Sequence, residues 1–211
     1  PGPHDSDYLF DEFIQAIDRK AAICRGGSGR PILKKGAITV ILIIDFGSQY
    51  NQLIARRVRE HQVYCQIEPP GIGLEKIHTL KPEGIILSGG PASIYEARSP
   101  RVDKGIFDLG IPVLGICYGL QFMVDALGGQ VVGAAKREYG FAELVVKKAG
   151  RLFPGVGKRT RCWMSHGDQV MRVSDDFIPL AKTTNCPIAA VKHKSLPIYC
   201  VQFHPEVTHT A

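Results

Sequence analysis

The chain has 211 residues, of which 45% are hydrophobic and 22% are charged, and its net charge at neutral pH is +6. These proportions are ordinary for one α/β domain with a sizeable core. No apolar run approaches the roughly 20 residues that a membrane-crossing helix needs, and the N-terminus lacks a signal-peptide pattern. The basic residues are scattered without interleaved aromatic ones, so we expect neither nucleic acid nor a membrane as a partner.

The six cysteines form no C-x-x-C pair and have no histidines at zinc-finger spacing. We interpret them as free thiols in a reducing compartment, which predicts a cytoplasmic protein without a metal site.

Residues 1–37 differ in sequence pattern from the rest of the chain. Residues 7–23 place apolar side chains at helical spacing, which predicts an amphipathic helix. Residues 25–31 have the composition of a flexible Gly/Ser linker. Neither part contains a catalytic motif.

From residue 38 onward, strand and helix patterns alternate. Residues 38–44 form a β-branched run typical of a buried parallel strand. Ser48 is expected to cap the helix that follows, with Leu53, Ile54 and Val58 on its apolar face. Further strands are expected at residues 63–67, 84–87 and 111–116, and a helix near 102–109. The pattern predicts a doubly wound, mostly parallel, flavodoxin-like α/β sheet with functional loops at the carboxyl ends of its strands.

After Gly128 and Gly129, the pattern changes to short β-like segments separated by turn signals. They lie at residues 142–146, 161–164, 170–173 and 188–191. The change predicts an antiparallel β region added to the parallel sheet, so that residues 38–211 form one domain.

Cys117 lies at the centre of the sequence Gly-Ile-Cys-Tyr-Gly, between an apolar run and a helical pattern. This arrangement of strand, tight turn and helix is the cysteine counterpart of the G-x-S-x-G nucleophile elbow. A helix N-terminus beneath the sulfur favours the reactive thiolate. The motif therefore predicts a catalytic nucleophile, and the alternative is a buried structural cysteine.

The sequence His204-Pro205-Glu206 follows the apolar strand expected at residues 198–203. A histidine and a glutamate two residues apart on an extended segment project to the same side, so the carboxylate can orient the imidazole. Together with Cys117, they would supply a nucleophile, a base and an orienting group.

Residues 38–211 closely resemble the class I (triad) glutamine amidotransferase domain of the GMP synthetases. The elbow and the His-Pro-Glu motif are shared by the whole amidotransferase class. Three further segments look specific to the GMP synthetases: Asp-Phe-Gly-Ser-Gln-Tyr at 45–50, Ile-Ala-Arg-Arg-Val-Arg at 54–59 and Trp-Met-Ser-His-Gly-Asp at 163–168. Asn51 stands where the family commonly has threonine.

The resemblance implies that the chain hydrolyses L-glutamine through a glutamyl thioester on Cys117, with His204 moving protons and Glu206 holding its tautomer. It implies an oxyanion hole formed by Gly89, Gly90 and Tyr118. It also implies that glutamine is bound by Gln121 and by a loop containing Ser165, His166, Gly167 and Asp168.

Some of these residues have plainer interpretations. Asp168 could equally be a surface turn residue. We interpret Tyr50, Arg56 and Arg57 as packing and surface helix residues.

The resemblance further implies that ammonia passes to an ATP pyrophosphatase module, fused or separate, which uses ATP and Mg to aminate XMP to GMP. The amidotransferase domain itself would need no cofactor. Three alternatives stay open: an amidotransferase of anthranilate, CTP or carbamoyl phosphate synthesis, a stand-alone cysteine hydrolase such as a γ-glutamyl hydrolase, and a regulatory module without turnover.

In this family, a further helix follows the His-Thr pair and packs on the sheet. The chain ends soon after Glu206, yet residues 9–17 repeat the apolar spacing of that helix. Residues 1–37 are therefore expected to be either a circularly permuted terminal helix with its linker or an unrelated extension on a truncated domain.

Overall fold

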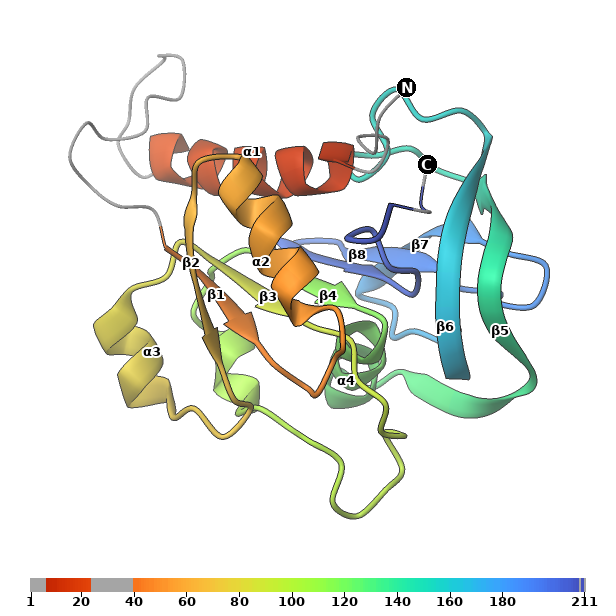
Figure 1. Cartoon of the computed structure of the whole chain (residues 1–211), viewed down its shortest axis with the longest axis horizontal. Helices are drawn as coiled ribbons and strands as arrows, with labels where there is room; N and C mark the ends of the chain where they lie inside the picture. Colours follow the sequence, from red (N-terminus) through yellow and green to blue (C-terminus); the bar gives the residue numbers. More distant parts are fainter. Residues whose placement is uncertain (1–6, 24–39, 209, 211) are drawn as a thin grey trace.

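The computed structural model describes residues 7–23, 40–208 and 210. The expected linker at residues 25–31 lies outside this range. In the described part, one nine-stranded sheet runs through the molecule in the order β2-β1-β3-β4-β9-β8-β7-β5-β6 (Figure 1).

The first half of the sheet is parallel. It consists of β1 (Val40–Ile44), β2 (Tyr64–Glu68), β3 (Gly84–Leu87), β4 (Val113–Ile116) and β9 (Ile198–Val201). With β2 outside β1, and β3, β4 and β9 on its other side, this is the strand order of the flavodoxin-like doubly wound fold. The predicted fold class is thus confirmed.

The second half of the sheet is antiparallel. It consists of β5 (Gln130–Val146), β6 (Arg159–Arg172), β7 (Phe177–Lys182) and β8 (Ala190–His193). Figure 1 shows β5 and β6 as a long ribbon at the end of the molecule opposite β2. The segments predicted at 161–164 and 170–173 fall in one strand, β6, apart from Val173, because the pairing with β5 runs from Arg159 to Arg172.

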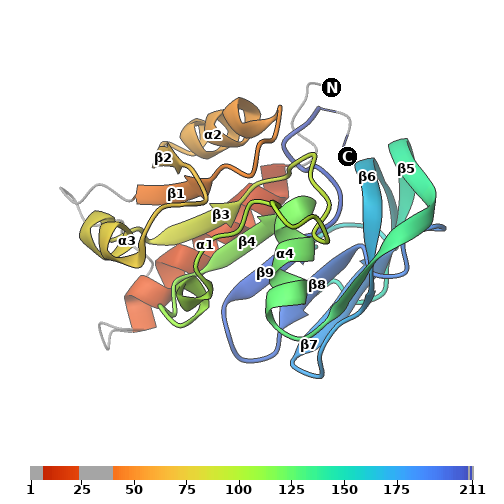
Figure 2. The same ribbon diagram turned by 90° about the horizontal axis from the view of Figure 1, so that it is seen from below.

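Helices cover both faces of the parallel half, as Figures 1 and 2 show. One face carries α1 (Asp7–Ile23) and α2 (Asn51–Glu60). The other carries α3 (Leu74–Leu80), the 3-10 turn η1 (Lys104–Phe107) and α4 (Tyr118–Ala126). No helix in the described ranges is both long and apolar enough to span a membrane.

The inner strands of the parallel half are hydrophobic on both sides because each face packs against helices. Successive β1 residues alternate between the two core clusters, with Ile41 and Ile43 facing α1 and α2, and Leu42 and Ile44 facing α3 and α4. This double burial explains the unbroken apolar run in the sequence.

Helix α1 belongs to the core of the domain. Its residues Leu9, Phe10, Phe13 and Ile17 are at most 3% exposed. A Cβ built on Gly84 of β3 would lie 2.5 Å from Cδ1 of Ile17, so the missing side chain there lets the helix approach the sheet closely.

Three local predictions differ from the structure. The helix expected at 102–109 is only the 3-10 turn η1. Ser48 does not cap α2: its hydroxyl accepts from the N–H of Tyr50, and the helix starts at Asn51. Leu53 lies on the outer side of α2 and is 37% exposed, whereas Ile54 and Val58 are fully buried as expected.

Candidate active site

Cys117 occupies the turn between β4 and α4, at the carboxyl edge of the parallel sheet. Its backbone has φ 52° and ψ −105°, a conformation that L-residues rarely adopt. Its N–H donates to Val201 O on β9 at 2.8 Å, which ties the turn to the neighbouring strand. Gly119 allows the turn to sit tightly on β3, since a Cβ there would lie 2.3 Å from Leu87 O. The thiol is therefore held at the apex of a sharp turn.

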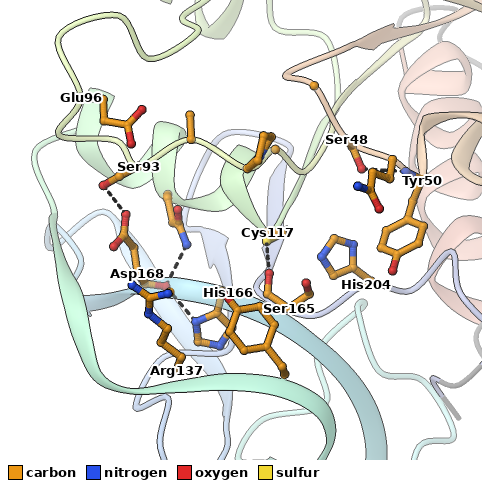
Figure 3. Close-up of a pocket in the computed structure, with 18 residues that line it drawn as sticks. Ser48, Tyr50, Ser93, Glu96, Cys117, Arg137, Ser165, His166, Asp168 and His204 are labelled. Carbon is orange, nitrogen blue, oxygen red and sulfur yellow. Dashed lines mark hydrogen bonds between the residues drawn. The ribbon is translucent and has the colours of Figure 1, made fainter.

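His204 and Glu206 form a buried pair just after β9. The Nδ1 atom of His204 lies 2.7 Å from Oε1 of Glu206, and the two residues are 4% and 1% exposed. Burial by itself lowers the pKa of His204, but the Glu206 carboxylate and the Cys117 thiolate outweigh it and raise that pKa well above its ordinary value. Figure 3 shows the His204 imidazole between Cys117 and Tyr50. The Tyr50 ring packs edge-on against the imidazole.

Gly89 lies directly against this group. A Cβ built on it would be 3.0 Å from Cε1 of His204 and 3.5 Å from Cβ of Cys117. The bare backbone after β3 therefore closes one side of the space around the sulfur. Tyr118, the first residue of α4, turns its side chain away, and its hydroxyl donates to Pro100 O.

A pocket of about 460 Å³ opens beside Cys117 and His204 (Figure 3). Its wall combines the turn after β1, the loop after β3, the start of α4 and the middle of the β5–β6 ribbon. Among the predicted ligand-binding and oxyanion residues, those that line the pocket are Gly90, Gln121, Ser165, His166, Gly167 and Asp168.

The segment Ser165–Asp168 was expected to be a loop, but it lies inside strand β6. Ser165 pairs with Tyr139 and His166 pairs with Glu138 on β5, which keeps the segment extended. The backbone carbonyl of Ser165 accepts a hydrogen bond from the Cys117 thiol, with 3.6 Å between O and Sγ. The ribbon thus brings the segment directly against Cys117.

Asp168 lines the pocket and is not an isolated surface turn residue. Its carboxylate accepts a hydrogen bond from the Ser93 hydroxyl, and its backbone carbonyl accepts from Nε2 of Gln121 at 2.9 Å. Gln121 therefore connects α4 to β6, and its amide group points toward protein atoms.

Gln202 is a polar residue that the sequence analysis did not identify. It is fully buried, its Nε2 lies 3.6 Å from Sγ of Cys117, and its Oε1 accepts from Gln121 at 3.3 Å. A glutamine inside the apolar run at residues 198–203 was the available signal, because a buried amide needs partners.

The segment around α2 also differs from expectation. Tyr50 lines the pocket, and Arg57 is buried, with its Nε donating to the backbone carbonyl of Glu206 at 3.4 Å. Only Arg56 is the exposed helix residue that was predicted. Arg57 is buried because α2 packs its inner side against the segment that follows β9.

Residues 42–211 match the sequence model of the family described as glutamine amidotransferase class-I. The match covers most of the chain, and the chain therefore belongs to the class-I glutamine amidotransferase family.

Within this family, the relatives include proteins named GMP synthase [glutamine-hydrolyzing]. The protein of Caldanaerobacter subterraneus is 55% identical over 170 residues, which cover 81% of this chain and 33% of the relative. That of Pseudomonas fluorescens is 51% identical over 178 residues, 81% of this chain and 34% of the relative. The chain thus spans about a third of the length of these relatives.

Solved structures show the same fold. A Thermoplasma acidophilum protein, provisionally described as one of the subunits of GMP synthase, is 34% identical with a TM-score of 0.77, covering 82% of this chain and 87% of the other. A glutamine amidotransferase of Thermotoga maritima has a TM-score of 0.67 at 21% identity, covering 81% of this chain and 77% of the other, and supports the fold alone.

Proposed function

We propose that this domain hydrolyses L-glutamine to glutamate and ammonia, with Cys117 as the nucleophile. The observation that carries the proposal is the placement of Cys117, in a strained turn at the N-terminus of α4, beside the buried His204–Glu206 pair and on the wall of a polar pocket. The family supports the same chemistry.

The first half of the reaction forms a thioester. The Cys117 thiolate attacks the carboxamide carbon of glutamine, and the C–N bond breaks as protonated His204 gives its proton to the leaving nitrogen. Ammonia leaves, and a glutamyl thioester remains. Because Glu206 occupies Nδ1 of His204, the other ring nitrogen, Nε2, is the one available for this transfer.

In the second half, neutral His204 takes a proton from water, and the resulting hydroxide attacks the thioester carbon. The C–S bond breaks and glutamate is released. Both tetrahedral intermediates carry an oxyanion, which backbone N–H groups would stabilise. The N–H of Tyr118 belongs to the first turn of α4, where helix N–H groups point outward to other acceptors. This N–H and the backbone of Gly89 and Gly90 are suited to the role.

Glutamine would be recognised through its α-groups in the outer part of the pocket. The Asp168 carboxylate suits the α-ammonium group, and the Arg137 guanidinium, which also lines the pocket, suits the α-carboxylate. Together they would direct the carboxamide toward Cys117.

The ammonia would serve an ATP pyrophosphatase module that aminates XMP to GMP with ATP and Mg, while the amidotransferase domain needs no cofactor. The relatives named GMP synthase support this partner, since they are about three times as long as the matched region. A cytoplasmic location suits the five cysteines that are free among the described residues.

The test is glutamate release from L-glutamine, measured with and without a GMP synthetase pyrophosphatase module, ATP and XMP. We expect release that rises with the module and falls to background in Cys117→Ala. Cys65→Ala is a matched control, because Cys65 is a buried thiol outside the pocket. Release that survives in Cys117→Ala would refute the proposed nucleophile, and GMP formation that does not depend on glutamine would refute the proposed partner.

A further inference from the structure

A second buried polar cluster lies behind the pocket wall, apart from Cys117 and its two partners. At its centre, Glu138 of β5 faces His166 of β6, its direct cross-strand neighbour. Their exposed fractions are 8% and 4%, and Oε2 of Glu138 lies 3.3 Å from Nε2 of His166. The other carboxylate contacts come from the Thr183 hydroxyl, at 2.9 and 3.0 Å, and from Nδ2 of Asn185 at 3.3 Å.

The hydrogen bond on the far side of the imidazole decides where its proton is. Nδ1 of His166 lies 2.8 Å from the backbone carbonyl of Asp168. A carbonyl oxygen can only accept, so Nδ1 must carry the hydrogen. In a neutral imidazole this leaves Nε2 with a lone pair, which would point at a carboxylate oxygen that is also an acceptor. The contact is favourable only if one additional proton lies between the two atoms.

The side chains that hydrogen-bond the Glu138 carboxylate in the described part of the chain, Thr183 and Asn185, are neutral. Burial raises the pKa values of Cys162 and Cys186 to about 12, so both remain neutral thiols. Burial also lowers the pKa of His166, and the nearby charge of His204 lowers it further, against the raising effects of Asp168 O and Glu138. One proton held between Nε2 of His166 and Oε2 of Glu138 satisfies the hydrogen-bond geometry of both side chains.

The same cluster resembles a metal site only in its residue types. Glu138, His166 and Cys186 offer ligand atoms within 4.8 Å of one another. However, Thr183 and Asn185 already bond the carboxylate, and the Cys186 thiol donates to Ile188 O at 3.3 Å. A metal would have to break these bonds and deprotonate the thiol.

We infer that Glu138 is a positioning residue for the glutamine pocket: it shares one proton with His166 and so holds the pocket-lining segment Ser165–Asp168 in place. His166 passes this constraint to Asp168 O, where Gln121 donates the second hydrogen bond. Glu138 itself does not line the pocket. The inference rests on the proposed glutaminase activity for its ligand, but the proton arrangement can be measured without turnover.

Two substitutions test whether Glu138 acts through a hydrogen shared with His166 or through a negative charge. In Glu138→Gln, the amide oxygen can accept from Thr183 and the amide N–H can donate to Nε2 of His166, which keeps one hydrogen between the two side chains. In Glu138→Leu, both bonds are lost. We expect Glu138→Gln to keep KM for glutamine and kcat within about twofold, and Glu138→Leu to raise KM about tenfold with a smaller effect on kcat.

The pH dependence gives a second readout. At alkaline pH, loss of the shared proton leaves a carboxylate facing a lone pair, so KM of the wild-type domain should rise more steeply than KM of Glu138→Gln. Glu143→Gln, an exposed residue of the same strand paired with Arg159, is the matched control and should follow the wild type. The inference is overturned if KM rises as much in Glu138→Gln as in Glu138→Leu, or if KM changes in neither variant.

NMR of the imidazole nitrogens tests the proton arrangement in the absence of glutamine. His166 signals, assigned with His166→Asn, should show the Nδ1–H tautomer in both the wild type and Glu138→Gln. An Nε2–H tautomer, or one equivalent of zinc bound by the purified protein, overturns the inference whatever the glutaminase assay gives. Conversely, an inactive protein with the expected tautomer counts against the proposed function and leaves the proton arrangement supported.

Discussion

The strained turn at Cys117 depends on Gly119, whose missing side chain lets α4 start against β3. A Cβ there would lie 2.3 Å from Leu87 O, a backbone atom that cannot move without displacing the strand. We expect Gly119→Ala to lower the free energy of unfolding by about 1–3 kcal/mol and to abolish glutamate release, because α4 would shift and carry Cys117 with it. Chemical denaturation and the glutaminase assay measure the two effects.

The control for this substitution is Gly73→Ala, whose Cβ would meet nothing within 4 Å. If Gly119→Ala and Gly73→Ala had the same unfolding free energy and the same rate of glutamate release, close packing at Gly119 would not be what positions Cys117.

Gln202 is expected to tune the reactivity of the nucleophile. Its amide N–H points at the sulfur, and a hydrogen bond to a charged group contributes about 1.5–3 kcal/mol. Gln202→Met keeps the length of the side chain but cannot donate, so alkylation of Cys117 by iodoacetamide at neutral pH should slow roughly tenfold or more. Gln66→Met, on β2 and outside the pocket, should leave the rate unchanged. An unchanged rate in Gln202→Met would show that the amide does not stabilise the thiolate.

The charge of His204 gives a pH dependence of stability with a defined sign. Its pKa is raised well above the ordinary value of 6.5 in the folded protein, so protonation favours the folded state. This stabilisation is fully present below about pH 6.5 and is lost as the pH rises through the folded-state value.

Glu206→Gln should therefore reduce the free energy of unfolding most below about pH 6.5, and the difference from the wild type should shrink toward alkaline pH. Denaturant titrations across this range measure the difference. A gap that widened with increasing pH would contradict the assigned sign.

At the scale of elements, α1 is the part of the structure whose role can be tested most directly. Phe13 is 3% exposed and lies against β3 near Gly84. Truncating a buried phenylalanine costs about 3–5 kcal/mol, so Phe13→Ala should lower the free energy of unfolding by that amount. Phe141→Ala, which removes an aromatic ring that is 60% exposed on β5, should cost far less.

Deleting residues 1–30 extends this test to the origin of the segment. A sharp drop in melting temperature is expected, because the α1 side of the core would be exposed to water. An unchanged melting temperature would exclude the permuted terminal helix and leave the unrelated extension, so the origin of residues 1–37 stays a prediction until then.

The parallel half of the sheet was predictable because its inner strands β1, β3 and β4, and strand β9, are apolar runs that are mostly buried on both faces, whereas the edge strand β2 is only partly buried. The antiparallel half was predicted less well, since exposed and buried positions mix along the ribbon. The β6 segment Ser165–Asp168 illustrates the reason: its polar residues and glycine are typical of a loop, and only pairing with β5 keeps them extended. Such a tertiary constraint leaves no local signal in the sequence.

Across the whole molecule, the pocket forms between the carboxyl edge of the parallel half of the sheet and the β5–β6 ribbon. Sequence motifs predicted Cys117, His204 and Glu206 as site residues, because an elbow and a His-Pro-Glu pair are local patterns. The supporting polar contacts were not predictable in this way. Gln202 is 81 residues from Gln121, and Glu138 is 28 residues from His166, so each contact exists only once the sheet has formed.

A backbone hydrogen bond joins the β5–β6 ribbon directly to the segment that carries His204 and Glu206: the N–H of His204 donates to Trp163 O on β6 at 3.0 Å. The Thr210 hydroxyl reinforces the link by accepting from the N–H of Trp163 at 3.1 Å. Within the sheet, the ribbon is connected to the parallel half through the successive strands β7, β8 and β9. Any displacement of the projecting ribbon would therefore move the His204 imidazole and the β6 wall of the pocket together.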